Sequence, residues 1–257
     1  MQSQEIFALI FVSTLFVGML VCLEYGRVLG RKRAEPGGKE GLSVIEGAIF
    51  ALLGLLIAFT FSGAAERFEN RRHMIVEEAN DIGTAYLRVD LLPVDTQPEI
   101  RDLFRRYVDS RIETYRIAAD DWKEALQHFA KSQALQNELW QKSVAAAARS
   151  GNTTASMLLL PALNEMIDIT TTRLAATEDH PPMIIFALLT LIALVTSMMA
   201  GFEMAPGTRR VWLHIIGYSL IMAISVYVIL DLEFPRLGLI RVDSFDKYIV
   251  EVRNAMK

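Results

Sequence analysis

Three side chains that could bind a metal ion recur at every fourth position in a charged stretch of the sequence. Glu69, His73 and Glu77 stand at i, i+4 and i+8, so a helix would place them on one face. Such a row could hold a divalent cation, or it could form a histidine-based pH sensor. Three ligands from one helix cannot close a coordination shell alone, and this spacing is frequent on solvated helix faces. We therefore predict no metal site and keep these residues as weak candidates.

The rest of the sequence carries no recognisable catalytic pattern. The remaining histidines, His128, His180 and His214, are scattered along the chain. We find no nucleophile elbow, phosphate loop, zinc box or dinucleotide fingerprint. The single cysteine, Cys22, excludes an intrachain disulfide, and a net charge of −4 is too small to indicate a nucleic-acid partner. We expect no enzymatic activity, no cofactor and no nucleic acid.

A second set of candidates follows one face of the apolar segment that precedes residue 66. It has a carboxylate at one end, large apolar side chains in the middle and guanidinium groups at the other end. Repeated around a symmetry axis, this stripe would form a hydrophobic constriction between charged mouths, a common plan for a channel. The alternative is that its apolar side chains face lipid or the subunit's own core. The pore-lining candidates are Glu46, Phe50, Leu53, Ile57, Thr60, Arg67 and Arg71.

Small residues form a neighbouring stripe on the same segment, at heptad spacing. In lipid, small side chains allow two helix backbones to approach closely. The stripe could therefore contact the first or third apolar segment of the same subunit, or it could contact another subunit. Its members are Gly47, Ala51, Gly54, Ala58 and Ala65.

Four apolar segments, 6–23, 42–65, 183–204 and 211–230, are long enough to cross a bilayer, which needs about 20 such residues. The first lacks a basic leading region and a small-residue cleavage site, so we interpret it as a retained span. Lysines and arginines near the membrane balance at seven on each side, which leaves the sidedness open. We predict a multi-pass protein of the cell inner (plasma) membrane, with the lipid bilayer as a partner.

The sequence between the second and third spans is predicted to be helical throughout. No segment alternates with a period of two, so we expect no sheet. The second span and the helix after it can form one element over 43–91, about 70 Å long. Pro93 should end that helix, Asp120 or Asp121 should begin a later one, and Thr153 or Thr154 another. We interpret Glu78 and Asp81 as partners in hydrogen bonds between helices or subunits, the alternative being an ion-binding vestibule.

The predicted fold is an all-α membrane protein with four transmembrane helices. An extramembrane helical bundle is inserted between spans two and three. The predicted domains are the first transmembrane helix pair (1–65), the helical extramembrane domain (66–182), the second transmembrane helix pair (183–232) and a C-terminal tail with an amphipathic helix (233–257).

The stretch "FTFSGAAERFENRR" resembles the signature of bestrophin-type channels. In that signature a membrane helix ends in a Phe, a polar residue and an Ala, followed by an Arg-aromatic pair and another Arg. The chain also resembles, over nearly its whole length, a bacterial bestrophin-like family of multi-pass membrane proteins. The segments that carry this likeness are "GLLIAFTFSGAAERF", "VEEANDIGTAYLRVDLLP", "LLPALNEMIDITTTR" and "VYVILDLEFPRLGLIRVD". The residues that match the signature are Phe59, Ser62, Ala64, Arg67, Phe68 and Arg72.

Resemblance to bestrophins implies a homopentamer whose second span lines an anion-conducting pore, with the central helices in the cytosol. The sequence departs from that family at two signature positions, where Ser62 replaces an Asn and Glu69 replaces the second aromatic residue. It also has no acidic calcium-binding cluster, so we expect no calcium gating. We predict a homo-oligomeric, bestrophin-like channel for inorganic ions. The alternative is a non-conducting membrane sensor or scaffold whose helical domain binds a partner.

Overall fold

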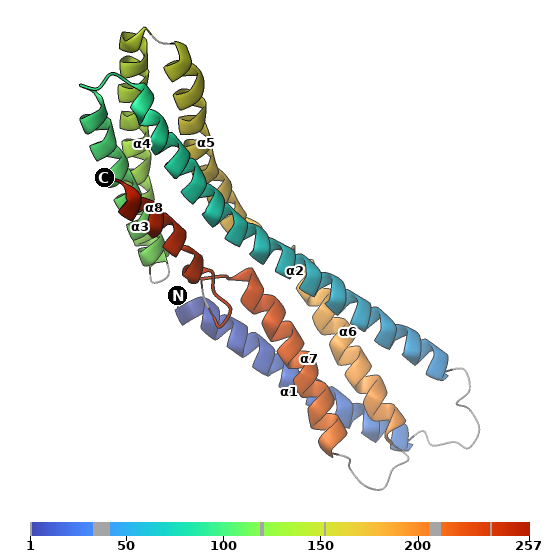
Figure 1. The fold of residues 1–257 in the computed structure, drawn as a ribbon. Coiled ribbons are helices and arrows are strands. Elements are labelled where there is room, and N and C mark those ends of the chain that lie inside the picture. The colour runs from blue at the N-terminus through green and yellow to red at the C-terminus, as the bar shows by residue number, and fades with distance from the viewer. Residues whose placement is uncertain (1, 33–41, 119–120, 152, 206–211, 237) are drawn as a thin grey trace. The chain divides into compact units, whose positions relative to one another are not determined.

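The computed structural model describes residues 2–32, 42–118, 121–151, 153–205, 212–236 and 238–257. Throughout this part of the chain the regular elements are helices, which confirms the predicted all-α class (Figure 1). Two of them are short 3₁₀ turns, η1 and η2. In chain order the elements are α1 (Gln2–Lys32), α2 (Leu42–Leu87), η1 (Arg88–Leu91), α3 (Gln97–Ala118), α4 (Trp122–Ser150), α5 (Thr153–Glu178), α6 (Met183–Glu203), α7 (Trp212–Glu233), η2 (Asp243–Phe245) and α8 (Lys247–Ala255).

Within the described ranges, four helical segments are long and apolar enough to cross a membrane, judged by length and composition. They are Ile6–Lys32, Val44–Leu91, Thr153–Glu203 and Trp212–Glu233, and the third of them contains α6. Each of the four predicted spans overlaps one of these segments, as the sequence indicated.

Helix α2 runs for 46 residues without a break, from Leu42 to Leu87. Proline is absent from this stretch of sequence, so every residue can continue the backbone ladder. The prediction of one continuous helix across the boundary between apolar and charged residues is therefore confirmed. At 1.5 Å per residue, α2 is about 70 Å long.

The described chain divides into two compact units, each of which we describe by itself. The first, which we call the apolar unit, comprises residues 2–66 and 180–234. The second, which we call the polar unit, comprises residues 67–179 and 235–257. Helix α2 thus contributes its first half to the apolar unit and its second half to the polar unit.

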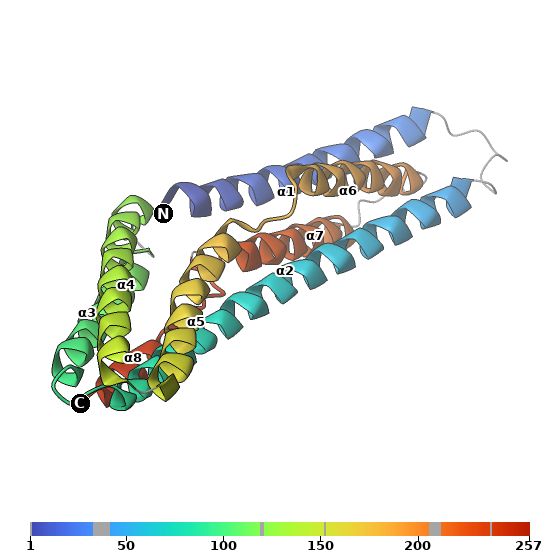
Figure 2. The same ribbon diagram turned by 90° about the horizontal axis from the view of Figure 1, so that it is seen from above.

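In the apolar unit, α1 packs along α6 and α7 (Figures 1 and 2). Glycines allow the backbones of α1 and α6 to touch. A Cβ atom added to Gly26 would lie 1.9 Å from the Met198 carbonyl oxygen, and one added to Gly201 would lie 1.9 Å from that of Leu23. No side chain fits at either position, so this helix crossing requires glycine.

In the polar unit, α4 lies between α3 and α5, and α8 packs on α3 (Figures 1 and 2). Asp121 caps α4, because its carboxylate accepts hydrogen bonds from the backbone N–H groups of Lys123 and Glu124. Gly151 ends the same helix with a φ of 61°, a left-handed conformation that favours glycine. The cap at Asp121 confirms the predicted start of α4, and α5 begins at Thr153, as predicted.

Candidate functional site

The apolar half of α2 is poorly covered by the rest of its own chain. Among its described side chains from Val44 to Ala65, two are buried, Leu53 at 2% exposure and Ala64 at 0%. Large apolar residues such as Leu55 and Phe59 are more than half exposed. A helix of this composition can hide such a surface only in lipid or against another chain.

The predicted pore-lining stripe lies on the covered side of α2 and at its edge. Glu46, Phe50, Ile57 and Thr60 are half-buried, and Leu53 is buried. The ring of Phe50 meets that of Tyr218 on α7 edge-on, with 6.2 Å between centroids.

The small-residue stripe lies on the exposed side of α2. Gly47, Ala51, Gly54 and Ala58 are all exposed, and a Cβ atom added to either glycine would meet nothing within 4 Å. The described chain does not cover this face with its own spans. Contact with the first or third span of the same chain, one of the two alternatives that the sequence left open, is therefore absent at these four residues.

The basic end of the pore-lining stripe, Arg67 and Arg71, lies in the polar unit. Arg71, a pore-lining candidate, is buried at 7% exposure. Its Nε donates to the Ala176 carbonyl at 2.9 Å and its Nη2 to that of Asp179 at 2.8 Å. A guanidinium at these carbonyls satisfies and electrostatically stabilises the C-terminus of α5.

The six residues of the family motif divide between exposed, half-buried and buried positions. Arg72 stacks over Phe245, with 4.2 Å from its guanidinium carbon to the ring centroid, and forms an ion pair with Glu69. Phe68 is buried, whereas Arg67 is half-buried. In the apolar unit, Phe59 and Ser62 are exposed and Ala64 is buried.

A buried ionic cluster forms the centre of the polar unit. Glu78 of α2 is fully buried and forms ion pairs with Arg111 of α3 and Arg173 of α5. Arg111 Nε donates to Glu78 Oε1 at 2.7 Å, and the Tyr115 hydroxyl donates to Oε2 at 2.6 Å. Helices α2, α3 and α5 therefore meet at the Glu78 carboxylate. This contact agrees with the interpretation of Glu78 as a partner in hydrogen bonds between helices.

The electrostatics of the cluster keep Glu78 charged. Burial by itself raises the pKa of this carboxyl group. The guanidinium groups of Arg111 and Arg173, with the hydrogen bonds from Arg111 and Tyr115, outweigh burial and lower the pKa to about 2. Burial also acts to lower the pKa of Arg111, but the adjacent Glu78 raises it above its usual value. Both partners are thus ionised at neutral pH.

One turn further along α2, Asp81 is shifted in the opposite direction. Partial burial and the nearby carboxylates of Glu77, Glu165 and Glu78 raise its pKa to about 6. The pKa values of Glu78 and Asp81 therefore differ widely although both residues lie on α2, because guanidinium groups lower the pKa of Glu78 and nearby carboxylates raise that of Asp81.

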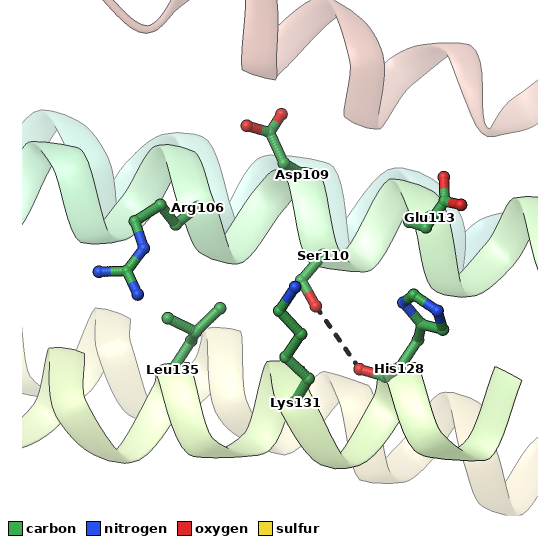
Figure 3. A pocket seen from close by; sticks show the side chains of 7 residues that line it. All are labelled: Arg106, Asp109, Ser110, Glu113, His128, Lys131 and Leu135. Atoms are coloured by element: carbon green, nitrogen blue, oxygen red, sulfur yellow. Dashed lines mark hydrogen bonds between the residues drawn. The ribbon is translucent and has the colours of Figure 1, made fainter. Parts of the chain in front are cut away.

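A groove in the polar unit lies between α3 and α4 (Figure 3). Its volume is about 330 Å³, and both cations and carboxylates line it. Asp109 pairs with Arg253 and Glu113 pairs with Arg116, so both acids of the groove are already neutralised. Arg106 and Lys131 at its rim are exposed. This mixed, solvated surface does not define a ligand.

The weak metal candidates Glu69, His73 and Glu77 lie on an exposed face of α2. Glu69 is engaged by Arg72. Across the ranges that the structure describes, no group of three or more His, Cys, Asp or Glu side chains could hold a metal ion. The structure thus gives these residues no support as ligands.

Two features of the site were missed in the sequence. The first is the identity of the partners of Glu78, which lie 33 and 95 positions away along the chain and share no local pattern. The second is the glycine pair Gly26 and Gly30 in α1, whose four-residue spacing is the recognised signal for close helix packing in membranes.

The fold and its helices define the class of protein. The part of the chain that the structure describes is helical and includes four apolar segments of spanning length, as in a membrane protein. The model of the bestrophin-like domain family matches residues 12–244, nearly the whole chain, so the chain belongs to the bestrophin-like family. Comparison with curated proteins and with solved structures finds no similar protein in either set.

Proposed function

We propose that the chain is a subunit of a homo-oligomeric ion channel in the inner membrane, with the apolar half of α2 lining the pore. Family membership supports this class of function. The observation that carries the proposal is the exposure of α2, whose apolar half is almost uncovered within one chain. In this arrangement the four apolar helices cross the bilayer, and the helical bundle inserted between spans two and three lies outside it.

The exposure pattern suggests how the faces of α2 divide their roles. Successive residues turn by about 100° around a helix, so Phe50 and Ile57 border the exposed side while Leu53 lies behind them. The small residues Ala51 and Ala58 follow on the exposed side. In our proposal Phe50 and Ile57 narrow the pore, and the small residues pack against α2 of the next subunit.

Cysteine accessibility during current recording tests this arrangement. Replacement of the single native cysteine in a Cys22→Ser background leaves the chain free of thiols. We expect a water-soluble thiol reagent to block current through Ile57→Cys and Phe50→Cys channels. The matched control is Leu52→Cys, on the exposed side of α2 and about 100° around the helix from the nearest member of either stripe along the chain, which we expect to conduct normally after treatment.

The recording itself decides between the channel and the alternative function. Purified protein in planar bilayers under a potassium chloride gradient should give unitary currents. Reversal near the chloride potential would indicate an anion channel, and reversal near the potassium potential a cation channel. Silence from protein that is oligomeric in the membrane would contradict the proposal and favour a sensor or scaffold.

A further inference from the structure

The chain that follows α7 forms a loop with an exposed leucine near its middle. The described residues of this loop are 235–236 and 238–242. The backbone N–H of Val242 donates to the Pro235 carbonyl at 2.9 Å, so the two ends of the loop lie side by side. Gly238 turns the chain with a φ of 79°, a left-handed conformation that favours glycine. We call this segment the Leu239 loop.

The ends of the Leu239 loop are held by the polar unit. The Arg236 guanidinium pairs with Asp243 at 3.1 Å and with Asp246 at 2.9 Å. Val242, at the other end of the loop, is buried at 3% exposure. The loop therefore begins and ends on a fixed base, and its middle is the part that can contact other molecules.

The side chain in the middle of the loop is apolar and uncovered. Leu239 is 81% exposed within its own chain, whereas the next residue, Ile240, is half-buried. Single apolar side chains are common on protein surfaces, so exposure alone does not identify a contact. The position of Leu239 along the chain, close to the end of an apolar helix of spanning length, distinguishes it from the other exposed apolar residues of the polar unit.

Covalent connection to α7 keeps Leu239 near the membrane. Helix α7 has 22 residues and ends at Glu233. At 1.5 Å per residue it is about 33 Å long, close to the roughly 30 Å of the hydrocarbon core, so its end lies at the membrane boundary. Leu239 follows six residues later, a distance of at most about 20 Å in extended chain, and the closed loop spans less. The acyl chains are therefore within reach of this side chain.

The charges beside Leu239 suit a phospholipid surface. Residues 236–247 contain three basic and two acidic side chains, a net charge of +1. Arg241 and Lys247 are exposed, and Arg241 also pairs with Asp243. An apolar side chain with basic neighbours is typical of anchors that lie in the membrane interface. Because the net charge is small, we expect the apolar contact to dominate and attraction to anionic lipid to add little.

We propose that Leu239 inserts into the acyl-chain boundary of the membrane leaflet at which α7 ends. The partner is a phospholipid surface, and the contact anchors the start of the C-terminal tail to that surface. The inference requires that α7 crosses the bilayer. It is independent of the proposed channel, because neither a pore nor an ion current enters the argument or the test.

Spin labels on the full-length protein in vesicles of phosphatidylcholine and phosphatidylglycerol test the insertion. In the Cys22→Ser background, a nitroxide is attached to Leu239→Cys, and its collisions with oxygen and with a water-soluble nickel complex are measured. Oxygen concentrates in acyl chains, whereas the polar nickel complex is excluded from them. Val94→Cys is the matched control, because Val94 is also 81% exposed and lies in the polar unit beyond the end of α2. Ile221→Cys, in the middle of α7, gives the reference for lipid.

We expect the ratio of oxygen to nickel collisions at position 239 to exceed that at position 94 severalfold and to approach that at position 221. A ratio at position 239 equal to that at position 94 would overturn the proposal, because it would place Leu239 in water. A label at position 239 that neither reagent reaches would also overturn it, because protein rather than lipid would then cover the loop.

Photocrosslinking identifies the partner without a nitroxide. A diazirine amino acid of apolar character at position 239 should form an adduct with phospholipid on illumination, and the same amino acid at position 94 should not. Mass spectrometry distinguishes a lipid adduct from a crosslink to a second copy of the chain. A crosslink to protein in place of lipid at position 239 would contradict the proposal.

Discussion

Replacement of Glu78 by Gln should strongly destabilise the polar unit at neutral pH. The ordinary pKa of a glutamate, 4.5, falls to about 2 in the folded protein. Since one pKa unit is about 1.4 kcal/mol, this difference corresponds to about 3 kcal/mol of folding free energy. Gln resembles a protonated carboxyl group, so the substitution removes that contribution by leaving Arg111 and Arg173 without their shared negative charge. For a domain of this size, about 3 kcal/mol lowers the midpoint of thermal unfolding by roughly 6–12 °C.

The pH dependence gives the same prediction a second readout. A carboxyl group whose pKa is lowered by folding stabilises the fold fully above its unfolded pKa, and loses this effect as the pH falls through the folded value. The native protein should therefore lose stability between pH 4.5 and about pH 2, and Glu78→Gln should lose less over that window.

Thermal unfolding of the full chain in detergent, followed by circular dichroism, measures both effects. Glu77→Gln is the matched control, because it removes the same charge from the neighbouring, exposed position. We expect this control to unfold within about 2 °C of the native protein, as most exposed substitutions do. Equal midpoints for the Glu78 and Glu77 variants would refute the argument that the buried cluster stabilises the unit.

Three further substitutions test other parts of the structure. Gly26→Ala should destabilise the apolar unit, because its Cβ atom would overlap the Met198 carbonyl group. Gly217→Ala is the control and should not destabilise the unit, because a Cβ atom there meets nothing within 4 Å. Thermal unfolding in detergent compares the two variants. Asp121→Ala should cost about 1 kcal/mol in denaturant unfolding through loss of the α4 cap, and an unchanged midpoint would remove its assigned role. Because burial and neighbouring carboxylates raise the pKa of Asp81 to about 6, Asp81→Asn should stabilise the protein at pH 7.5, and the gain should shrink as the pH falls from 6 to 4.

The continuity of α2 could be predicted from the sequence because it depends on local rules. No proline or turn cluster separates its apolar and charged halves, and helical periodicity continues through both. The cap at Asp121 was predictable for the same reason, since its side chain binds N–H groups only two and three residues away.

Local rules could not predict which part of the protein, or which surroundings, each face of α2 contacts. Periodicity separates the face of Phe50 from the face of Ala51, but both are compatible with lipid, with the chain's own core and with a neighbouring subunit. The burial of Glu78 could not be predicted either, because the arginines that neutralise it come from two other helices. Arg71 shows the same effect: its charge suited a pore mouth, but the C-terminus of α5 supplies its acceptors.

The contrast between Glu78 and Asp81 indicates what kind of signal the second half of α2 can carry. Glu78 stays ionised throughout the physiological range, because a pKa of about 2 lies far below it. The cluster therefore acts as a fixed joint between α2, α3 and α5, and protonation does not release it. Asp81, whose pKa is raised to about 6, changes charge at mildly acidic pH on the same helix.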